Sequence, residues 1–433
     1  MERGQCLLGL VVFLTVAAGV GMVRARRHGD RWVMPWRTVV GGLVLSFGFA
    51  VAVLYAPGFL KGVQFAVNQL LGFTEAGAKM VFGNLAGMDA PVVDPASGAM
   101  MPQVARVGSI VAFVVLPTIL FVSTLTAICY HTGLLTLVVH GLAWVMKKTI
   151  GCSGAEALST AANIFVGQTE APLLIKPFLA GATRSELMVI MVGGFANIAT
   201  GVLVVYAEVL GPFIKDVGGH LAAACFISAP VTLIIGKLLL PESGRPETGG
   251  AMSFKVERVD ANLIDAAARG TSEGLLLALN VGAMLVAFTA LIALLNAVYG
   301  GAFGLVGIEG ASLEKHVGYL MAPVAWLCGV SWSEAPFVGQ LLAKKTVLNE
   351  FLAYLDMGAA LTANPAALSE RSRLLTAYAL CGFANVASIG IQVGGISVLA
   401  PGRRADLSRL GAVAMLGGFL ATCVGACVVG MVV

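Results

Sequence analysis

Charged residues are scarce in this sequence. Asp, Glu, Lys and Arg make up 12% of its 433 residues, whereas soluble globular proteins contain roughly 25%. Apolar and aromatic residues make up 58%, and the mean hydropathy is +0.90. Tryptophan and tyrosine are few, at 5 and 7 residues, and the apolar runs are longer than the roughly ten alternating residues of a barrel strand. The sequence therefore indicates an all-α membrane protein.

Paired metal-binding or disulfide-forming residues are also lacking. The eight cysteines include no Cys-x-x-Cys pair, and the five histidines are scattered. Most of the cysteines lie in or beside apolar runs, where we expect small packing residues. We therefore expect no cofactor. Lys and Arg form no cluster interleaved with exposed aromatics, so nucleic acid is not an expected partner.

Eight apolar runs are long enough to cross roughly 30 Å of hydrocarbon as helices. They lie at about 5–23, 38–57, 107–129, 187–210, 218–240, 274–298, 374–399 and 408–432. Basic residues follow the first, third and seventh runs, which share the cytoplasmic face if both termini are outside. The five arginines at 24, 26, 27, 31 and 37 argue against a cleaved signal peptide. We expect a multi-pass protein of the inner (plasma) membrane, surrounded by lipid.

Two further regions, 152–184 and 316–356, are apolar at both ends but polar in the middle. Their centres read Gly-Gln-Thr-Glu-Ala-Pro at 167–172 and Ser-Trp-Ser-Glu-Ala-Pro at 331–336. A helix broken inside the membrane leaves backbone groups that lipid cannot satisfy, so it must face protein or a wet cavity. We predict two re-entrant hairpins of half-helices, with Pro172 and Pro336 in the first turn of each second half.

The same order of features occurs twice. Thr-Glu-Ala-Pro at 169–172 corresponds to Ser-Glu-Ala-Pro at 333–336, and Gly-Phe-Ala-Asn-Ile-Ala-Thr at 194–200 corresponds to Gly-Phe-Ala-Asn-Val-Ala-Ser at 382–388. By the span count the hairpins enter from opposite faces, so the repeats are inverted. Such repeats indicate a secondary transporter with its site near the bilayer midplane. The alternative is a duplication retained for packing alone.

The segments TAANIFVGQTEAPLLIKPF (160–178), ALNVGAML (278–285) and LCGFANVASIGI (380–391) resemble the concentrative nucleoside transporter family. The resemblance implies a homotrimer with a scaffold and a mobile transport unit. Residues 1–150 would be mainly scaffold, with spans 1–3 and interfacial helices, and 151–240 the first repeat, with hairpin 1 and spans 4–5. Residues 241–300 would hold a cytoplasmic linker, including a short helix at 259–268, and scaffold span 6; 301–433 would be the second repeat, with hairpin 2 and spans 7–8.

Glu170 and Glu334 are carboxylates in otherwise apolar hairpins, where an acid at mid-bilayer costs about 2.5–3.5 kcal/mol. From the residues alone, the alternative role for each is capping of the following half-helix. The resemblance implies that Gln168, Thr169 and Glu170 face the nucleobase, and that Glu334, Asn385 and Ser388 hold the ribose. It also places Val202 and Phe383 beside the base, where ordinary helix packing is the alternative. For Asn385 and Ser388 the alternative is interhelical hydrogen bonding. We expect structural roles for the remaining charged residues of the second half-helices, which are Lys176, Lys344, Lys345 and Glu350.

The resemblance further implies a sodium site made by Asn163, Val166, Asn197 and Ile198. Neutral oxygens at a helix break suit a weakly bound monovalent ion. Asn197 departs from the small hydroxyl residue expected there, although its amide oxygen can replace a hydroxyl. The intact Asn-x-x-Val-Gly-Gln-Thr-Glu pattern at 163–170 favours sodium over protons.

These features together predict a sodium-coupled symporter that takes up nucleosides, with uridine as the reference substrate, by alternating access. Proton coupling is the alternative within the same class. An intramembrane enzyme using Glu170 and Glu334 as acid and base is the alternative from another class. Against the enzyme, the sequence shows no nucleophile with a base beside it. A passive channel would explain the hairpins but not the substrate and cation ligands.

Overall fold

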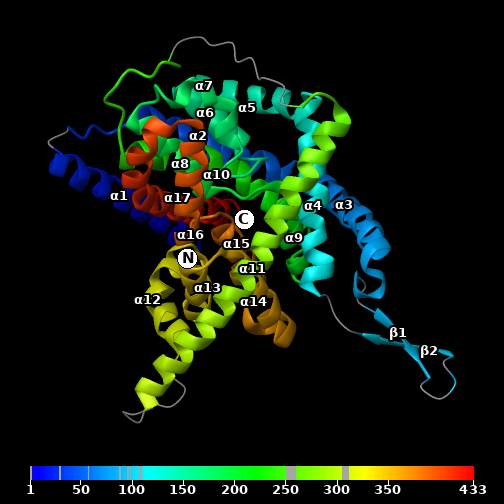
Figure 1. The fold of residues 1–433 in the computed structure, drawn as a ribbon. Helices are drawn as coiled ribbons and strands as arrows, with labels where there is room; N and C mark the ends of the chain where they lie inside the picture. The colour runs from blue at the N-terminus through cyan, green and yellow to red at the C-terminus, as the bar shows by residue number, and fades with distance from the viewer. Residues whose placement is uncertain are drawn as a thin grey trace.

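The computed structural model describes residues 2–28, 31–56, 58–86, 89–94, 97, 99–106, 110–249, 260–304 and 312–433. Helices dominate these residues, which confirms the all-α class. The first helices are α1 (Glu2–His28), α2 (Trp36–Tyr55), α3 (Phe59–Phe82), α4 (Val111–His131) and α5 (Leu134–Ile150). A short antiparallel ribbon of β1 (Asp89–Val93) and β2 (Met100–Arg106) projects from the helical body after α3 and η1 (Gly83–Ala86) (Figure 1).

The middle of the chain contains the first copy of the repeated sequence motifs. Its helices are α6 (Gly154–Ala162), η2 (Ala171–Ile175), α7 (Lys176–Leu179), α8 (Arg184–Ala196), α9 (Thr200–Leu210) and α10 (Val217–Leu239). The long helix α11 (Leu263–Gly304) follows. The expected separate helix at 259–268 is wrong, because residues 260–262 are not helical and residues 263–268 belong to the beginning of α11. Residue 259 lies outside the described residues.

The last part of the chain contains the second copy of these motifs. Its helices are α12 (Leu313–Leu327), α13 (Ala335–Val347), α14 (Glu350–Ala363), η3 (Pro365–Ala367), α15 (Glu370–Leu380), α16 (Val386–Leu399), η4 (Pro401–Arg403) and α17 (Arg404–Val432). Pro172 and Pro336 lie in the first turns of η2 and α13, as expected. A proline costs least there, because the first N–H groups of a helix have no partner within it.

Seven stretches among the described residues are long and apolar enough to cross a membrane. They are α1, α2, α4, α8 with α9, α10, α11, and α17 with η4. Seven of the eight expected runs therefore correspond to such stretches. The run expected at 374–399 has no such stretch, because residues 381–385 separate α15 from α16 and each of these helices is shorter than a full span. Residues 197–199 likewise separate α8 from α9 within the run expected at 187–210.

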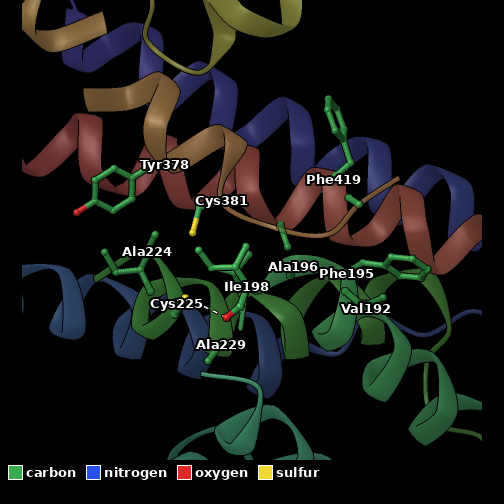
Figure 2. Packing of buried hydrophobic residues seen from close by; sticks show 14 of the residues in the cluster. Val192, Phe195, Ala196, Ile198, Ala224, Cys225, Ala229, Tyr378, Cys381 and Phe419 are labelled. Atoms are coloured by element: carbon green, nitrogen blue, oxygen red, sulfur yellow. Dashed lines mark hydrogen bonds between the residues drawn. The ribbon is translucent and has the colours of Figure 1, made fainter. Parts of the chain in front are cut away.

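The two breaks lie in the repeated Gly-Phe-Ala-Asn motif and pack against each other. A Cβ atom on Gly382 would lie 2.8 Å from the carbonyl oxygen of Phe195, so only glycine permits this approach. Figure 2 shows Ile198 of the first break near Cys381 of the second, with Cys225 of α10 alongside. The repeat in the sequence therefore becomes a pair of apposed helix breaks in the core.

The short helices on either side of each polar turn pack against each other. The helix α12 packs along α13, and the carbonyl group of Gly318 directly faces Gly339, where a side chain would collide with it. Small residues allow such close packing of helices. The helix α6 also packs against η2. The first hairpin and the second lie on opposite sides of α8, α10 and α17 in Figure 1, an arrangement in keeping with inverted repeats.

Burial differs strongly between helices. Most residues of α8, α9 and α10 are buried, as is the C-terminal half of α17, and α10 packs against α2, α8 and α17. The helix α11 packs along α4, with Gly270 and Gly274 at the contact, but most of its remaining residues are exposed. The protein therefore has a buried bundle around α10 and a long outer helix with little cover.

A buried ion cluster joins the first hairpin to this bundle. Lys237 Nζ of α10 lies 2.6 Å from Glu156 Oε1 and 3.1 Å from Glu242 Oε2, and it donates to Ser185 Oγ over 2.9 Å. Glu156 and Glu186 complete capping boxes at the first turns of α6 and α8. Partial burial raises the pKa of Glu242, but the Lys237 ammonium and other donors outweigh it and hold this pKa below its usual value. The cluster thus fixes α6 and α8 to the end of α10.

Candidate functional site

The polar turn of the first hairpin contacts one face of α16. Gln168 Nε2 donates to Ser388 Oγ over 3.3 Å, and Gln168 Oε1 accepts from Gln392 Nε2 over 3.1 Å. A Cβ atom on Gly395 would lie 2.8 Å from Cγ2 of Thr169, so Thr169 packs on the same helix. Positions 388, 392 and 395 share one helix face because they are separated by four and three residues. Two expected substrate ligands, Gln168 and Ser388, are therefore in contact although 220 positions separate them.

Asn385 begins α16 and joins it to a buried carboxylate. Its Oδ1 accepts from the backbone N–H of Ser388 over 2.9 Å, the usual bond of an N-cap residue. Its Nδ2 donates to Glu350 Oε2 over 3.2 Å, and the hydroxyl of Tyr206 donates to Glu350 Oε1 over 2.8 Å. Glu350 thus connects α9, α14 and the first turn of α16. These bonds match the structural role expected for Glu350 and the interhelical bonding weighed for Asn385.

Glu334 lies at the turn of the second hairpin and bonds to serines. Its carboxylate accepts from Ser331 Oγ over 2.6 Å, from the backbone N–H of Ser369 over 2.6 Å, and from the Ser369 and Ser372 hydroxyls. A carboxylate has about four lone-pair sites, so these donors occupy most of its capacity. Among the described residues, no hydrogen bond joins Glu334 to Asn385 or Ser388. The hairpin turn is instead attached to the first turn of α15.

The capping alternative for the two hairpin glutamates is wrong. Glu170 and Glu334 both occupy the N-cap position, but neither side chain accepts a capping hydrogen bond from the helix that follows. Glu170 Oε2 instead accepts from the backbone N–H of Gly167, three residues earlier, over 3.2 Å, and the residue is exposed. This carboxylate therefore keeps acceptor capacity for another group.

The two apolar positions are less distinctive. Val202 is buried in α9, and Phe383 is half-buried in the break between α15 and α16. Both pack with the hydrophobic core, as the packing alternative requires. Their expected place beside a nucleobase remains a prediction.

The expected sodium ligands come from the ends of two helices. Asn163 ends α6 and Asn197 ends α8, and both are buried together with Val166 and Ile198. Asn197 Nδ2 lies 3.4 Å from the carbonyl oxygen of Gly193, and a Cβ atom on Gly193 would lie 3.1 Å from Asn163 Nδ2. The two asparagines therefore share the neighbourhood of Gly193, which makes room for them.

Further neutral oxygens surround this position. Ser228 Oγ donates to Asn197 Oδ1 over 2.5 Å. The hydroxyls of Thr160 and Thr232, both near Gly193, are buried and have no hydrogen-bond partner among the described residues. The described residues contain no group of three His, Cys, Asp or Glu side chains able to hold a metal ion. Neutral oxygen donors of this kind suit a monovalent cation better than a divalent one.

Sequence reasoning missed three features of this region. Gln392 lies within the apolar run 374–399 and was not singled out, although a polar residue inside such a run is itself a signal. Ser369 and Ser372, which bond Glu334, lie before that run and carry no local signal. Thr232 lies inside an apolar run, where a hydroxyl usually bonds its own helix. Only the tertiary structure brings these groups to the hairpins.

Known transporters resemble the chain along almost its whole length. Residues 8–85 and 220–430 match the N- and C-terminal domains of Na⁺-dependent nucleoside transporters, and residues 112–213 match a domain described as nucleoside recognition. An uncharacterized transporter of Bacillus subtilis, YutK, is 42% identical over 402 residues, which cover 91% of this chain and 92% of the relative. Sodium/nucleoside cotransporter 1 of Mus musculus is 38% identical over 447 residues, covering 99% of this chain and 64% of the relative.

Solved structures resemble the chain as well. CNTnw in an inward-facing, substrate-bound state is 34% identical and has a TM-score of 0.86, covering 100% of this chain and 98% of that one. A variant of CNTnw in an outward-facing state is 35% identical and has a TM-score of 0.87. These relatives are transporters and not enzymes, as the sequence predicts for this chain.

Proposed function

The chain belongs to the concentrative, Na⁺-dependent nucleoside transporter family, and from this premise we propose that it takes up nucleosides together with sodium by alternating access. It is a multi-pass membrane protein, and we place it in the inner membrane with both termini outside. A sodium ion that moves inward gains about 2.3 kcal/mol per 100 mV of membrane potential, in addition to its concentration gradient. This free energy is sufficient to drive nucleoside uptake against a gradient.

The observation that carries the proposal is the contact between Gln168 and Ser388. It joins the turn of the first hairpin, expected to face the base, to the helix expected to hold the ribose. We propose that a nucleoside such as uridine binds along this face of α16. The amide of Gln168 and the hydroxyl of Thr169 supply donors and acceptors for the base edge, and the exposed carboxylate of Glu170 adds acceptors.

If a nucleoside binds to Glu334, this carboxylate must change its hydrogen-bond partners. We propose that nucleoside hydroxyls replace the donors now supplied by Ser369 and Ser372. A carboxylate accepting from two vicinal hydroxyls forms charge-assisted bonds. The exchange would release the second hairpin from α15, with Asn385 and Ser388 completing the ribose site, and it offers a physical link between substrate binding and hairpin movement.

We propose that sodium binds near Gly193, with Asn163 and Asn197 as side-chain ligands and the carbonyl groups of Val166 and Ile198 as backbone ligands. The helix breaks support this assignment, because the last carbonyls of a helix lack intrahelical partners. Asn163 lies five residues before Gln168, so the ion and the nucleoside would order the same turn of the first hairpin. Binding of either one would then favour binding of the other.

We propose that the scaffold comprises mainly residues 1–150 and, after the cytoplasmic linker, span 6 within 241–300. Residues 151–240 and 301–433 would then form the two repeats of the mobile unit. We also propose a homotrimer. The large exposed apolar residues of α11 support a partner subunit or lipid against this helix, and examples are Leu276, Leu279, Val286, Leu294 and Val298.

Uptake of radiolabelled uridine into proteoliposomes tests the proposal. An inward sodium gradient should drive accumulation, and replacement of sodium by choline should remove it. Unchanged uptake in choline would contradict sodium coupling, and uptake driven by a proton gradient alone would establish the proton-coupled alternative. Absence of uptake under every gradient would contradict the transporter proposal itself. Chromatography of the recovered label checks that the nucleoside stays intact.

A further inference from the structure

Gln392 is the most completely buried polar side chain next to the proposed nucleoside site. Its residue is 0% exposed, and it lies on the face of α16 that holds Ser388. Its Nε2 donates twice, to the carbonyl oxygen of Met191 over 3.2 Å and to Gln168 Oε1 over 3.1 Å. Both hydrogens of this amide are therefore used to connect α8, α16 and the turn of the first hairpin.

The space for this contact is created by a glycine. A Cβ atom on Gly194 of α8 would lie 2.7 Å from Gln392 Nε2 and 3.0 Å from Gln168 Cβ. Any larger residue at 194 would push the two amides apart. The site is thus built from three separate segments, and packing alone does not require an amide at position 392.

The buried oxygen of the same amide supports this interpretation. Gln392 Oε1 has no hydrogen-bond partner among the described residues. A buried acceptor without a partner is destabilising, and a methionine would fill similar space without that cost. The two donated bonds are therefore the physical reason for a glutamine here.

These bonds fix the polarity of a chain of amides. The carbonyl group of Met191 belongs to the backbone and can only accept, so Gln392 must present its NH₂ group there. Gln168 must then present Oε1 to Gln392, because its own NH₂ group would meet another donor. Its Nε2 is thereby directed to Ser388, with one hydrogen left for a ligand.

We propose that Gln392 is a positioning residue that sets which edge of the Gln168 amide a nucleobase meets, and so determines base selectivity. This inference rests on the proposed nucleoside site. Uracil has a hydrogen-bond donor at ring position 3 and an acceptor on carbon 4, whereas cytosine has an acceptor at position 3 and a donor on carbon 4. Hypoxanthine and adenine differ in the same way at the equivalent positions. A fixed amide discriminates within each pair, whereas an amide free to turn over accommodates both members.

The test measures binding of uridine, cytidine, inosine and adenosine to the purified full-length protein in sodium. We expect the wild type to bind the members of each pair with different affinities. Gln392→Met should reduce that difference by at least about fivefold, as expected for the loss of one directed hydrogen bond. Ser397→Ala is the matched control, because Ser397 lies on the same helix and its hydroxyl donates to the carbonyl group of Val393 in that helix. It should retain the wild-type ratios.

Two further variants separate positioning from general damage. In a Gln168→Ala background, Gln392→Met should have no further effect on the ratios, because the amide that it orients is gone. Ser388→Ala should weaken the binding of all four nucleosides but preserve the order of their affinities. This variant tests the orientation of the two amides even if Gln392→Met fails to fold. Equal affinities in the wild type, unchanged ratios in folded Gln392→Met, or a lost order in Ser388→Ala would each overturn the inference. Absence of any nucleoside binding to the wild type would overturn the proposed function instead.

Discussion

Individual residues account for the hairpin contacts through partners that are distant in sequence. Glu334 faces three serine hydroxyls and a backbone N–H group, so it is satisfied without substrate. If nucleoside hydroxyls replace some of these donors, the carboxylate must keep its charge to bind them strongly.

We therefore expect Glu334→Gln to weaken uridine binding about 100-fold, since two charge-assisted hydrogen bonds would become weaker neutral ones. Isothermal titration calorimetry in sodium measures this. Glu370→Gln is the control, because Glu370 is an exposed glutamate in the first turn of the adjoining helix. Wild-type affinity in Glu334→Gln would show that the ribose is bound elsewhere.

Lys237 offers a separate test of stability. Its ammonium group is the charged partner of Glu156, whose side chain is 1% exposed. Lys237→Met should lower the free energy of unfolding by about 3–5 kcal/mol, because it leaves a buried carboxylate uncompensated. Thermal unfolding in detergent should show a lower midpoint than for Lys215→Met, which removes an exposed lysine. Equal midpoints would mean that water or another cation compensates Glu156.

Residue roles could be predicted only where a local pattern carried them. The glutamates stood out because acids are costly in apolar segments, and the positions of the two prolines followed from the chemistry of a helix start. The serines around Glu334 and the contact of Gln392 with Gln168 could not be predicted, because they arise from segments that meet only after folding.

Helix breaks interrupt two of the long apolar runs. Apolar length predicted eight spanning runs, and two of them, 187–210 and 374–399, are each interrupted by a break between two helices. Neither break contains proline or a charged residue, so hydropathy alone could not reveal them. The repeated Gly-Phe-Ala-Asn motif was the available signal. The asparagine of the first copy ends α8, and that of the second copy begins α16. Gly382, the glycine of the second copy, allows the two breaks to pack together.

The close contact within the second hairpin leads to a prediction. Gly339→Ala would place a Cβ atom against the Gly318 carbonyl oxygen and 2.9 Å from the backbone nitrogen of Ala322. Because backbone atoms cannot easily move away, we expect a loss of about 1–3 kcal/mol in stability, measured by thermal unfolding, and slower uridine uptake.

Gly394→Ala is the matched control for this prediction. Gly394 lies in α16, and a Cβ atom there would meet nothing within 4 Å. Alanine is preferred to glycine inside a helix by up to about 1 kcal/mol, so this variant should be as stable as the wild type or slightly more stable. Equal stability of both variants would indicate that α12 and α13 separate readily.

At the scale of the whole molecule, the outer helix α11 remains largely uncovered while α8–α10 are buried. This distribution suits a mobile unit held in a scaffold that contacts lipid or other subunits. Composition predicted the membrane class, and the repeat predicted two related hairpins but not the breaks at 197–199 and 381–385. Subunit contacts left no comparable pattern, because residues facing lipid and residues facing a partner are equally apolar.

We expect native mass spectrometry of the protein released from mild detergent to give three times the subunit mass of 44.5 kDa. Cross-linking at several protein concentrations provides the control, since a specific trimer should persist on dilution. A dominant monomer or dimer under both conditions would contradict the homotrimer.

We propose that a nucleoside and sodium order the same hairpin turn, so that each should strengthen the binding of the other. The most direct test is calorimetric titration of uridine at several sodium concentrations, with choline maintaining the ionic strength. We expect the dissociation constant for uridine to fall as the sodium concentration rises. A dissociation constant that is the same in sodium and in choline would contradict it.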